Sequence, residues 1–175
     1  MFERRPSWER DFEAFFLARR RLYLRIAYTI VGDWQRAEDA TQDTFSSLYA
    51  KWTTIRGREP DPFARKVLVN ACLRILRQRR RGNELPSEPE ALDVVRHDDP
   101  DAALSLDLSA ALATLSPQHR AVVALRYLHD LSVAEVAATL RVPEGTVKSQ
   151  SARGLDALRA HLERSGSDPV PALRA

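Results

Sequence analysis

The sequence has very few of the residues that build disulfides or membrane spans. Its one cysteine, Cys72, excludes a disulfide within the chain and is typical of a reducing compartment. No run of about eighteen apolar residues is present, so we expect no transmembrane helix. Segment 1–16 lacks the apolar centre of a secretory signal peptide. These absences predict a cytoplasmic protein that has no membrane partner.

Residues that could form an active site are also sparse. The sequence has no glycine-rich phosphate loop, no cluster of metal ligands and no paired nucleophile and base. The four histidines are scattered, at His97, His119, His129 and His161. Catalysis requires such groups to converge on one site. We therefore predict that the protein is not an enzyme and holds no cofactor or metal.

Helix-forming residues are abundant, and charge is unevenly placed. The 175 residues include only six glycines and much alanine, leucine and arginine, which favours helices. Segment 1–82 carries a charge of +8 (18 basic, 10 acidic residues), 83–101 carries −6 (one basic, seven acidic) and 102–175 carries +1 (eight basic, seven acidic). This division predicts an all-α fold of two small helical domains, 7–82 and 102–164. A flexible acidic linker over 83–101 would join them.

Three or four helices are predicted in the first domain. Ser7 can cap a helix that ends at Gly32, and Asp33 can cap a second helix over 34–51. After a loop over 53–62, a third helix begins near Pro62 and runs to about Arg81. The spacing of apolar residues predicts these buried positions: Phe12, Phe15, Phe16, Leu22, Tyr23, Ile26 and Ile30, then Ala37, Thr41, Phe45 and Leu48, then Phe63, Val67, Leu68, Ala71, Cys72, Ile75 and Leu76.

Two polar faces stand out in this domain. The second helix gathers acids and an amide at Glu38, Asp39, Gln42 and Asp43. Asp39 and Asp43 are like charges four residues apart, an arrangement that costs a few tenths of a kcal/mol unless a cationic partner neutralises it. The third helix carries a stripe of Lys66, Asn70, Arg74, Arg77 and Arg81, which can track a phosphate backbone. Each face also fits an ordinary solvated surface.

The second domain ends in a pair of helices joined by a tight turn. Ser116 and Pro117 can start a helix after one at about 101–115, and Ser132 with Glu135 forms a capping box for the next. Pro143 fits the first turn of the last helix. On that helix Val147, Ser151, Leu155, Leu158 and Leu162 would be buried, whereas Thr146, Lys148, Ser149, Gln150 and Arg153 would face outward.

This pattern is typical of a helix-turn-helix that lays its second helix in the major groove of DNA. The outward side chains can hydrogen-bond base edges and phosphates. A plain helical hairpin with a solvated polar face fits the same periodicity.

Three motifs in this order resemble the extracytoplasmic-function (ECF) sigma factors of bacterial RNA polymerase, in the sigma-70 family. AEDATQDTFSSLYAKW (37–52) resembles the family's region 2.2, and DPFARKVLVNACLRILRQRRR (61–81) resembles regions 2.3 and 2.4. LSPQHRAVVALRYLHDLSVAEVAATLRVPEGTVKSQSARGLDALR (115–159) resembles region 4. The resemblance covers roughly residues 10–163, with the acidic link lying between the motifs.

The resemblance implies a sigma factor that recruits core polymerase to promoters. Contacts to the β′ clamp helices would come from Glu38, Asp39, Gln42, Asp43 and Phe45. The −10 element would be melted and held by Lys66, Asn70, Arg74, Arg77 and Arg81, with the loop 53–62 shaping a base pocket and Trp52 either stacking there or lying in the core. The −35 element would be read by Thr146, Lys148, Ser149, Gln150 and Arg153. Further partners implied are the β flap and an anti-sigma factor.

Two departures from the commoner family pattern are present. Gln150 replaces the arginine that often follows G-T-V-K-S, and glutamine favours adenine where arginine favours guanine. Ala40-Thr41 replaces an apolar pair in region 2.2. The glutamine suggests the actinobacterial SigE-like subgroup. A stand-alone regulator with the same helix-turn-helix is the alternative, although it would need neither the acidic face nor the basic helix.

Overall fold

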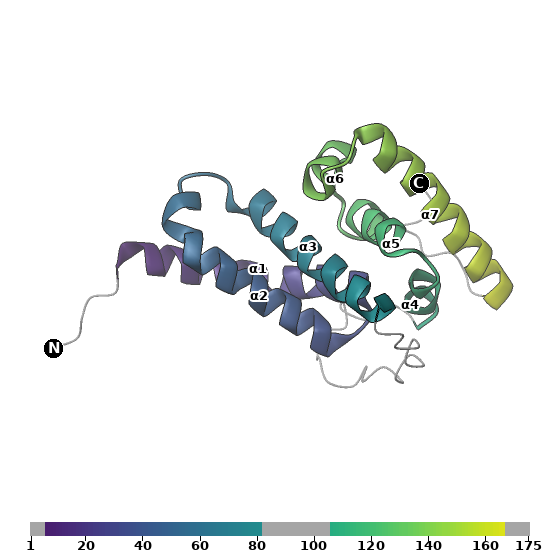
Figure 1. The fold of residues 1–175 in the computed structure, drawn as a ribbon, viewed down its shortest axis with the longest axis horizontal. Helices are drawn as coiled ribbons and strands as arrows, with labels where there is room; N and C mark the ends of the chain where they lie inside the picture. The colour runs from purple at the N-terminus through teal and green to yellow at the C-terminus, as the bar shows by residue number, and fades with distance from the viewer. Residues whose placement is uncertain (1–5, 82–105, 167–175) are drawn as a thin grey trace.

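The computed structural model describes residues 6–81 and 106–166, and every regular element in those ranges is a helix (Figure 1). The predicted linker over 83–101 lies outside them. The helices are α1 (Ser7–Val31), α2 (Trp34–Ile55), α3 (Pro60–Arg81), α4 (Leu106–Ala113), α5 (Pro117–Val123), the π-helical turn η1 (Ala124–Leu128), α6 (Val133–Leu140) and α7 (Glu144–Ser165). None of them has the length and apolarity that a membrane crossing requires.

Local capping chemistry fixes most of the helix ends. Gly32 takes a left-handed φ of 74° and donates its N–H to the Tyr28 carbonyl, which ends α1 as predicted. The Asp33 carboxylate accepts the Arg36 N–H at 2.8 Å and starts α2. The Ser116 hydroxyl accepts the His119 N–H at the start of α5. The α helix over 7–31, the cap at Asp33 and the Ser116 cap are therefore confirmed.

Four local predictions are wrong in detail. Pro6, not Ser7, occupies the cap position of α1, and no side chain caps that helix. Leu22 is 36% exposed and lies away from the core. Helix α2 continues to Ile55 and α3 begins at Pro60, so the loop predicted over 53–62 is reduced to residues 56–59. The helix expected to follow Pro117 changes at Ala124 into a π-helical turn.

The first three helices pack around a core of aromatic rings. Phe45 of α2 lies at its centre, with ring centroids 4.7 Å from Phe16 and 5.6 Å from Tyr23. Phe12 and Phe15 each lie about 5 Å from Trp52, at 5.2 and 5.1 Å. Trp52 is 3% exposed, so it belongs to the core. These rings hold α1, α2 and α3 in one unit, which is on the left in Figure 1.

The later helices form a second unit in which α7 packs along α4, α5 and α6. Its own cluster is aliphatic and contains Leu108, Ala111, Leu112, Leu115, Val123, Leu155, Leu158 and Leu162. All five residues of the predicted α7 stripe are buried, which confirms that prediction. Gly154 lets α7 approach α5 closely, because an added Cβ would lie 2.5 Å from Val123 Cγ2.

The two units pack against each other, chiefly through α3 and α6. Leu125, Leu131 and Val136 of the second unit lie in the same continuous core as the aromatic residues of the first. Arg65 of α3 forms an ion pair with Glu135 of α6 at 3.5 Å. Arg120 of α5 donates to the Ile30 carbonyl at the end of α1, at 3.2 Å. The described helices therefore form one body.

Candidate functional site

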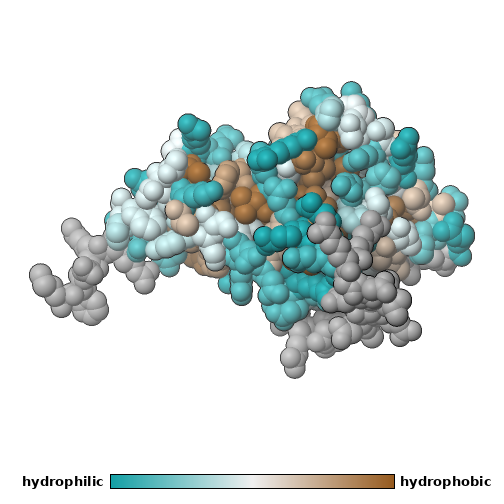
Figure 2. All heavy atoms as spheres, viewed as in Figure 1, coloured by the Kyte–Doolittle hydropathy of each residue, from teal (hydrophilic) through white to brown (hydrophobic). Residues whose placement is uncertain are grey.

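The basic stripe of α3 lies on the surface, on the side of the helix away from its buried residues. Asn70, Arg74 and Arg77 are exposed and Lys66 is half-buried. Arg77 donates its Nε to the Leu73 carbonyl of its own helix at 3.1 Å, which directs the guanidinium along the helix surface. Figure 2 shows hydrophilic residues gathered over the C-terminal half of α3 and the adjoining part of α2. The Arg81 side chain, also predicted in this stripe, lies outside the described residues.

Asp61 in the first turn of α3 bonds to two side chains of α1. The Asp61 carboxylate accepts the Tyr23 hydroxyl at 2.6 Å and pairs with the Arg19 guanidinium, whose Nη2 lies 2.7 Å away. Burial raises the pKa of Tyr23, and the hydrogen bond to Asp61 raises it further, so the phenol stays protonated and donates. This network orients the first turn of α3 against α1. The helix that carries the basic stripe is therefore held in place against α1 at its first turn.

The acidic face of α2 lies beside this stripe. Asp39, Gln42 and Asp43 are exposed, while Glu38 is half-buried. Asp39 accepts a long hydrogen bond from the Gln35 amide at 3.5 Å on its own helix. Phe45, also predicted as a polymerase contact, is 5% exposed and supports the helix from beneath. The face available to a partner is therefore the polar set, and Phe45 acts only through the core.

One ion pair joins the two faces. Arg74 Nη2 lies 3.0 Å from Asp43 Oδ2, and the two side chains are 59% and 65% exposed. Sequence spacing gave no indication of this contact, because it depends on how α2 and α3 pack side by side. The pair brings together two residues that were predicted to serve different partners.

The helix-turn-helix has the expected caps and the expected outward face. Ser132 and Glu135 form a complete capping box at the start of α6, with hydrogen bonds of 2.8 and 3.2 Å. This hydrogen bonding lowers the pKa of Glu135, which keeps its carboxylate charged. Arg141 ends α6 in the left-handed conformation, at φ 58°. Pro143 takes the cap position just before α7 rather than a place inside its first turn.

On α7 the predicted reading residues lie on the surface at its N-terminal half. Lys148, Ser149 and Arg153 are exposed, and Thr146 and Gln150 are half-buried. The Ser149 hydroxyl donates to the Thr146 carbonyl at 3.0 Å. This face has one long cation and several short polar groups in its first turns, which suits a helix that approaches base edges closely.

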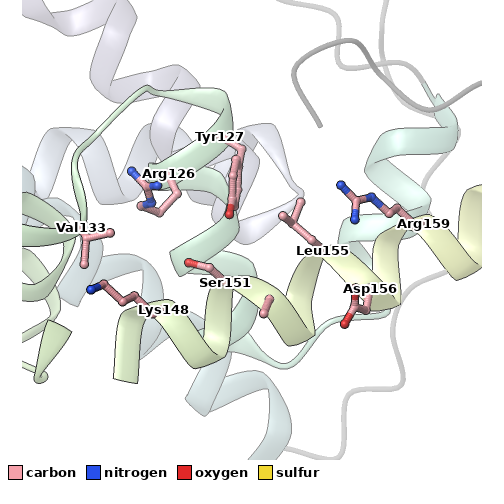
Figure 3. A pocket seen from close by; sticks show the side chains of 9 residues that line it. Arg126, Tyr127, Val133, Lys148, Ser151, Leu155, Asp156 and Arg159 are labelled. Atoms are coloured by element: carbon pink, nitrogen blue, oxygen red, sulfur yellow. The ribbon is translucent and has the colours of Figure 1, made fainter. Parts of the chain in front are cut away.

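A hollow of about 320 Å³ between η1 and α7 adds a cation that sequence reasoning missed (Figure 3). Arg126 and Tyr127 of η1 face Lys148 and Ser151 of α7 across it. Arg126 Nη1 donates to the Leu131 carbonyl at 2.7 Å, which fixes the guanidinium. The buried Arg126 Nε and Ser151 Oγ have no partner within the described residues. Arg126 precedes the helix-turn-helix in the chain, so only the π-helical turn reveals that it joins this surface.

Together these surfaces define a class of protein. A cationic stripe on a fixed helix suits a nucleic-acid strand, and a capped helix-turn-helix suits duplex DNA. The described residues contain no group of metal-ligating side chains. The fold and its surfaces are therefore those of a two-part helical DNA-binding protein of transcription.

Comparisons with known proteins specify the family. Residues 15–82 match the model of Sigma-70 region 2, and residues 111–160 match that of Sigma-70, region 4. The chain is 35% identical to the RNA polymerase sigma-E factor of Streptomyces coelicolor, over 87% of this chain and 86% of that protein. It is also 35% identical to the ECF RNA polymerase sigma factor SigE of Mycolicibacterium smegmatis, over 93% of this chain, and it spans 64% of that relative's length.

Solved structures of sigma factors are similar to this fold. The sigma factor RpoE in complex with the anti-sigma factor NepR from Bartonella quintana matches with a TM-score of 0.69 at 25% identity, covering 87% of this chain and 97% of that one. CnrH, solved with the cytosolic domain of CnrY, shares the fold with a TM-score of 0.66 at 19% identity. The chain belongs to the ECF sigma factors of the sigma-70 family. It is thus a factor that directs promoter-specific transcription, which is a non-enzymatic role.

Proposed function

We propose that this sigma factor divides promoter recognition between α3 and α7 and binds core RNA polymerase through α2. The region over 7–82 would bind the polymerase and the −10 element, 83–101 would act as the link, and 102–164 would bind the −35 element. The observation that carries this proposal is the stripe of exposed Asn70, Arg74 and Arg77 with half-buried Lys66, on a helix that lies within the match to Sigma-70 region 2. The factor would work in the cytoplasm, where polymerase and DNA are found.

The polymerase contact follows from charge. Asp39, Gln42 and Asp43 project from one exposed face of α2, and Glu38 lies at its edge. A cationic helical surface, as the β′ clamp helices would provide, would relieve the repulsion between Asp39 and Asp43. The β flap and an anti-sigma factor remain further proposed partners. The anti-sigma proposal is supported by the similarity to RpoE, which was solved with NepR.

The −10 contact follows from the geometry of α3. Three exposed residues at intervals of four and three, following Lys66, can meet successive phosphates of one strand. Trp52 is buried, so base stacking would need another surface near residues 53–62. The cations on this side of α3 would bind one strand of the −10 element and so keep the two strands apart.

The −35 contact follows from α7. Lys148, Ser149, Gln150 and Arg153 would face base edges, with Thr146 near a phosphate. The packing of Arg126 beside Lys148 supports a role for Arg126 in neutralising the same backbone. Gln150 would favour adenine at its position, because glutamine pairs with the adenine edge through two hydrogen bonds.

The deciding experiment is run-off transcription with purified core polymerase and the full chain on genomic fragments. We expect promoter-specific products with the wild type and none with Asp39→Arg, which also abolishes binding to core polymerase. Glu163→Arg is the matched control, because it reverses an exposed charge near the far end of α7. Transcription by Asp39→Arg at the wild-type level would contradict the polymerase contact. Tight, specific duplex binding by a dimer without polymerase would favour a stand-alone regulator instead.

A second experiment tests the proposed −35 contact of α7. In the reconstituted holoenzyme, Thr146→Ala should weaken binding to all promoters, because Thr146 is proposed to lie near a phosphate, and Gln150→Arg should change the preferred −35 base from adenine to guanine. A good bidentate contact discriminates between bases by about 1–3 kcal/mol. Sequencing of promoters selected from a randomised pool measures the change. An unchanged −35 preference in Gln150→Arg would exclude Gln150 as a reading residue.

A further inference from the structure

The ion pair between Arg74 and Asp43 joins the surfaces proposed for two different ligands. Asp43 belongs to the acidic face of α2, and Arg74 belongs to the cationic stripe of α3. Their side chains meet at 3.0 Å on the surface, where both remain more than half exposed. A partner of either residue can therefore reach it without any change in the core.

The other residues of the cationic stripe do not bond to α2 among the contacts described. Lys66 and Asn70 make no side-chain hydrogen bond or ion pair to the residues that the structure describes, and Arg77 donates one Nε to a carbonyl of its own helix. Arg74, at the centre of the stripe, is bonded to an acid of the neighbouring helix. A carboxylate beside a guanidinium also lowers the local positive potential that a phosphate would meet. The protein thus masks the middle of its own DNA surface.

We propose that this ion pair links polymerase binding to strand binding. When a cationic partner binds Asp43, Arg74 is released toward the phosphates of a single strand. When a phosphate binds Arg74, Asp43 is released toward the cationic partner. Such linkage is reciprocal, because each ligand must change the affinity for the other by the same factor. The inference rests on the proposed function, since it takes α2 as the polymerase face and α3 as the strand face.

The expected size of the linkage follows from exposure. An exposed ion pair stabilises by an amount that corresponds to about a 1.4- to 5-fold change in an equilibrium constant, and salt screens it. The linkage is thus a graded preference for binding both ligands together. It should be largest at low ionic strength and should fade as the Debye length shortens.

The first test measures the affinity of the full chain for a fluorescently labelled single-stranded DNA of mixed sequence at low salt. Asp43→Asn should bind about 1.4- to 5-fold more tightly than the wild type, because Arg74 is released. In the Arg74→Gln background the same substitution should give no such gain, so the double-mutant cycle should show coupling. Asp39→Asn is the matched control, since it removes the same charge one turn away, and its gain should be clearly smaller. Equal gains from Asp39→Asn and Asp43→Asn, or a gain that persists without Arg74, would overturn the inference.

The second test examines the reverse direction with core RNA polymerase. Arg74→Gln should bind core polymerase about 1.4- to 5-fold more tightly, because Asp43 is released, even though the variant binds DNA less well. Arg77→Gln is the control, because Arg77 lies on the same stripe without a bond to α2 among the contacts described. Normal binding of both ligands by the wild type without these crossed gains would overturn this inference alone. Failure of the wild type to bind either ligand would overturn the proposed function and this inference together.

Discussion

Helices α3 and α7 are equally long, at 22 residues each, yet the two units support them differently. Of the thirteen aromatic residues in the chain, only Tyr127 lies after residue 82. In the first unit, stacked and edge-on rings join α1 to α2, and each such ring buries about 150–250 Å². Helix α3 packs onto this core through aliphatic residues such as Leu68 and Val69. The second unit holds α7 with a small aliphatic cluster and with one close approach at Gly154.

The comparison shows that the second unit borrows part of its stability. Leu125, Leu131 and Val136 bury their side chains in the core that they share with α1 and α3. The first unit has a large aromatic core, whereas the second has a smaller aliphatic cluster of its own and shares part of the first unit's core. Four predictions test this difference, beginning with the largest effect.

Removing the central ring of the first unit should cost the most. Phe45→Ala should lower the free energy of unfolding by about 3–5 kcal/mol, because the ring contacts Phe12, Phe15, Phe16 and Tyr23. Urea unfolding of the full chain measures this loss. The matched variant in the second unit is Leu158→Ala, which should cost less because its cluster is smaller. A larger loss from Leu158→Ala would reverse the comparison.

The boundary between the units should make stability depend on pH. Burial, together with the nearby Arg25 guanidinium of α1, lowers the pKa of His129 from 6.5 to about 4, against an opposing effect of Asp130. In the unfolded chain His129 is therefore protonated below about pH 6.5, whereas in the folded chain it is protonated only below about pH 4. Stability should be unaffected by this group above pH 6.5 and should fall by roughly 3 kcal/mol between pH 6.5 and 4. Urea unfolding across this range should show a flatter profile for His129→Gln, and an unchanged profile would exclude His129 as the cause.

The close approach in the second unit should make a normally favourable substitution harmful. Gly154→Ala would place its Cβ 2.5 Å from Val123 Cγ2, a stiff branched side chain, so we expect a net loss of about 1–3 kcal/mol. Helix propensity alone would favour alanine by about 1 kcal/mol. Thermal unfolding decides between the two effects. Combining the change with Val123→Ala should recover part of the loss, and a stabilised single variant would show that α5 and α7 separate freely.

Loss of the α6 cap should have the smallest effect. Ser132→Ala removes the acceptor of the Glu135 N–H and should cost about 1 kcal/mol in thermal unfolding. Ser47→Ala is the control, because its hydroxyl bonds a carbonyl within α2 and caps nothing. We expect that control to be close to neutral. Equal losses from both variants would mean that the capping box does not stabilise the helix-turn-helix.

The helix ends and faces were largely predictable because their causes lie within a few residues. Gly32, Asp33 and the Ser132–Glu135 box act on neighbouring backbone groups, and the α7 stripe follows from helical spacing alone. The prediction that Ser7 caps α1 was wrong because the preceding Pro6 already has the non-helical backbone, at φ −53° and ψ 147°, that a cap position requires. The prediction that Leu22 is buried was wrong because apolar spacing does not show which surfaces of a helix a neighbouring helix will cover.

The surfaces were predictable residue by residue but not in their relation to each other. Asn70, Arg74 and Arg77 of the predicted stripe lie outward as expected, whereas Lys66 is half-buried. The pairing of Arg74 with Asp43 required the packing of α2 on α3. The family resemblance implied a polymerase contact for Phe45, yet its helical spacing already predicted burial, and the rings of α1 cover it. Arg126 of the π-helical turn Ala124–Leu128 lines the same hollow as Lys148, which helical spacing within the helix-turn-helix does not show.

The shared core also bears on how the chain can be cut into fragments. A fragment that begins after residue 101 would expose Leu125, Leu131 and Val136 to water, since their covering residues lie in α1 and α3. Bare apolar patches of this kind promote aggregation. The residues that match Sigma-70 region 2 and those that match region 4 thus share one hydrophobic core. Crystallisation or binding studies of the helix-turn-helix alone would need polar replacements at those three positions.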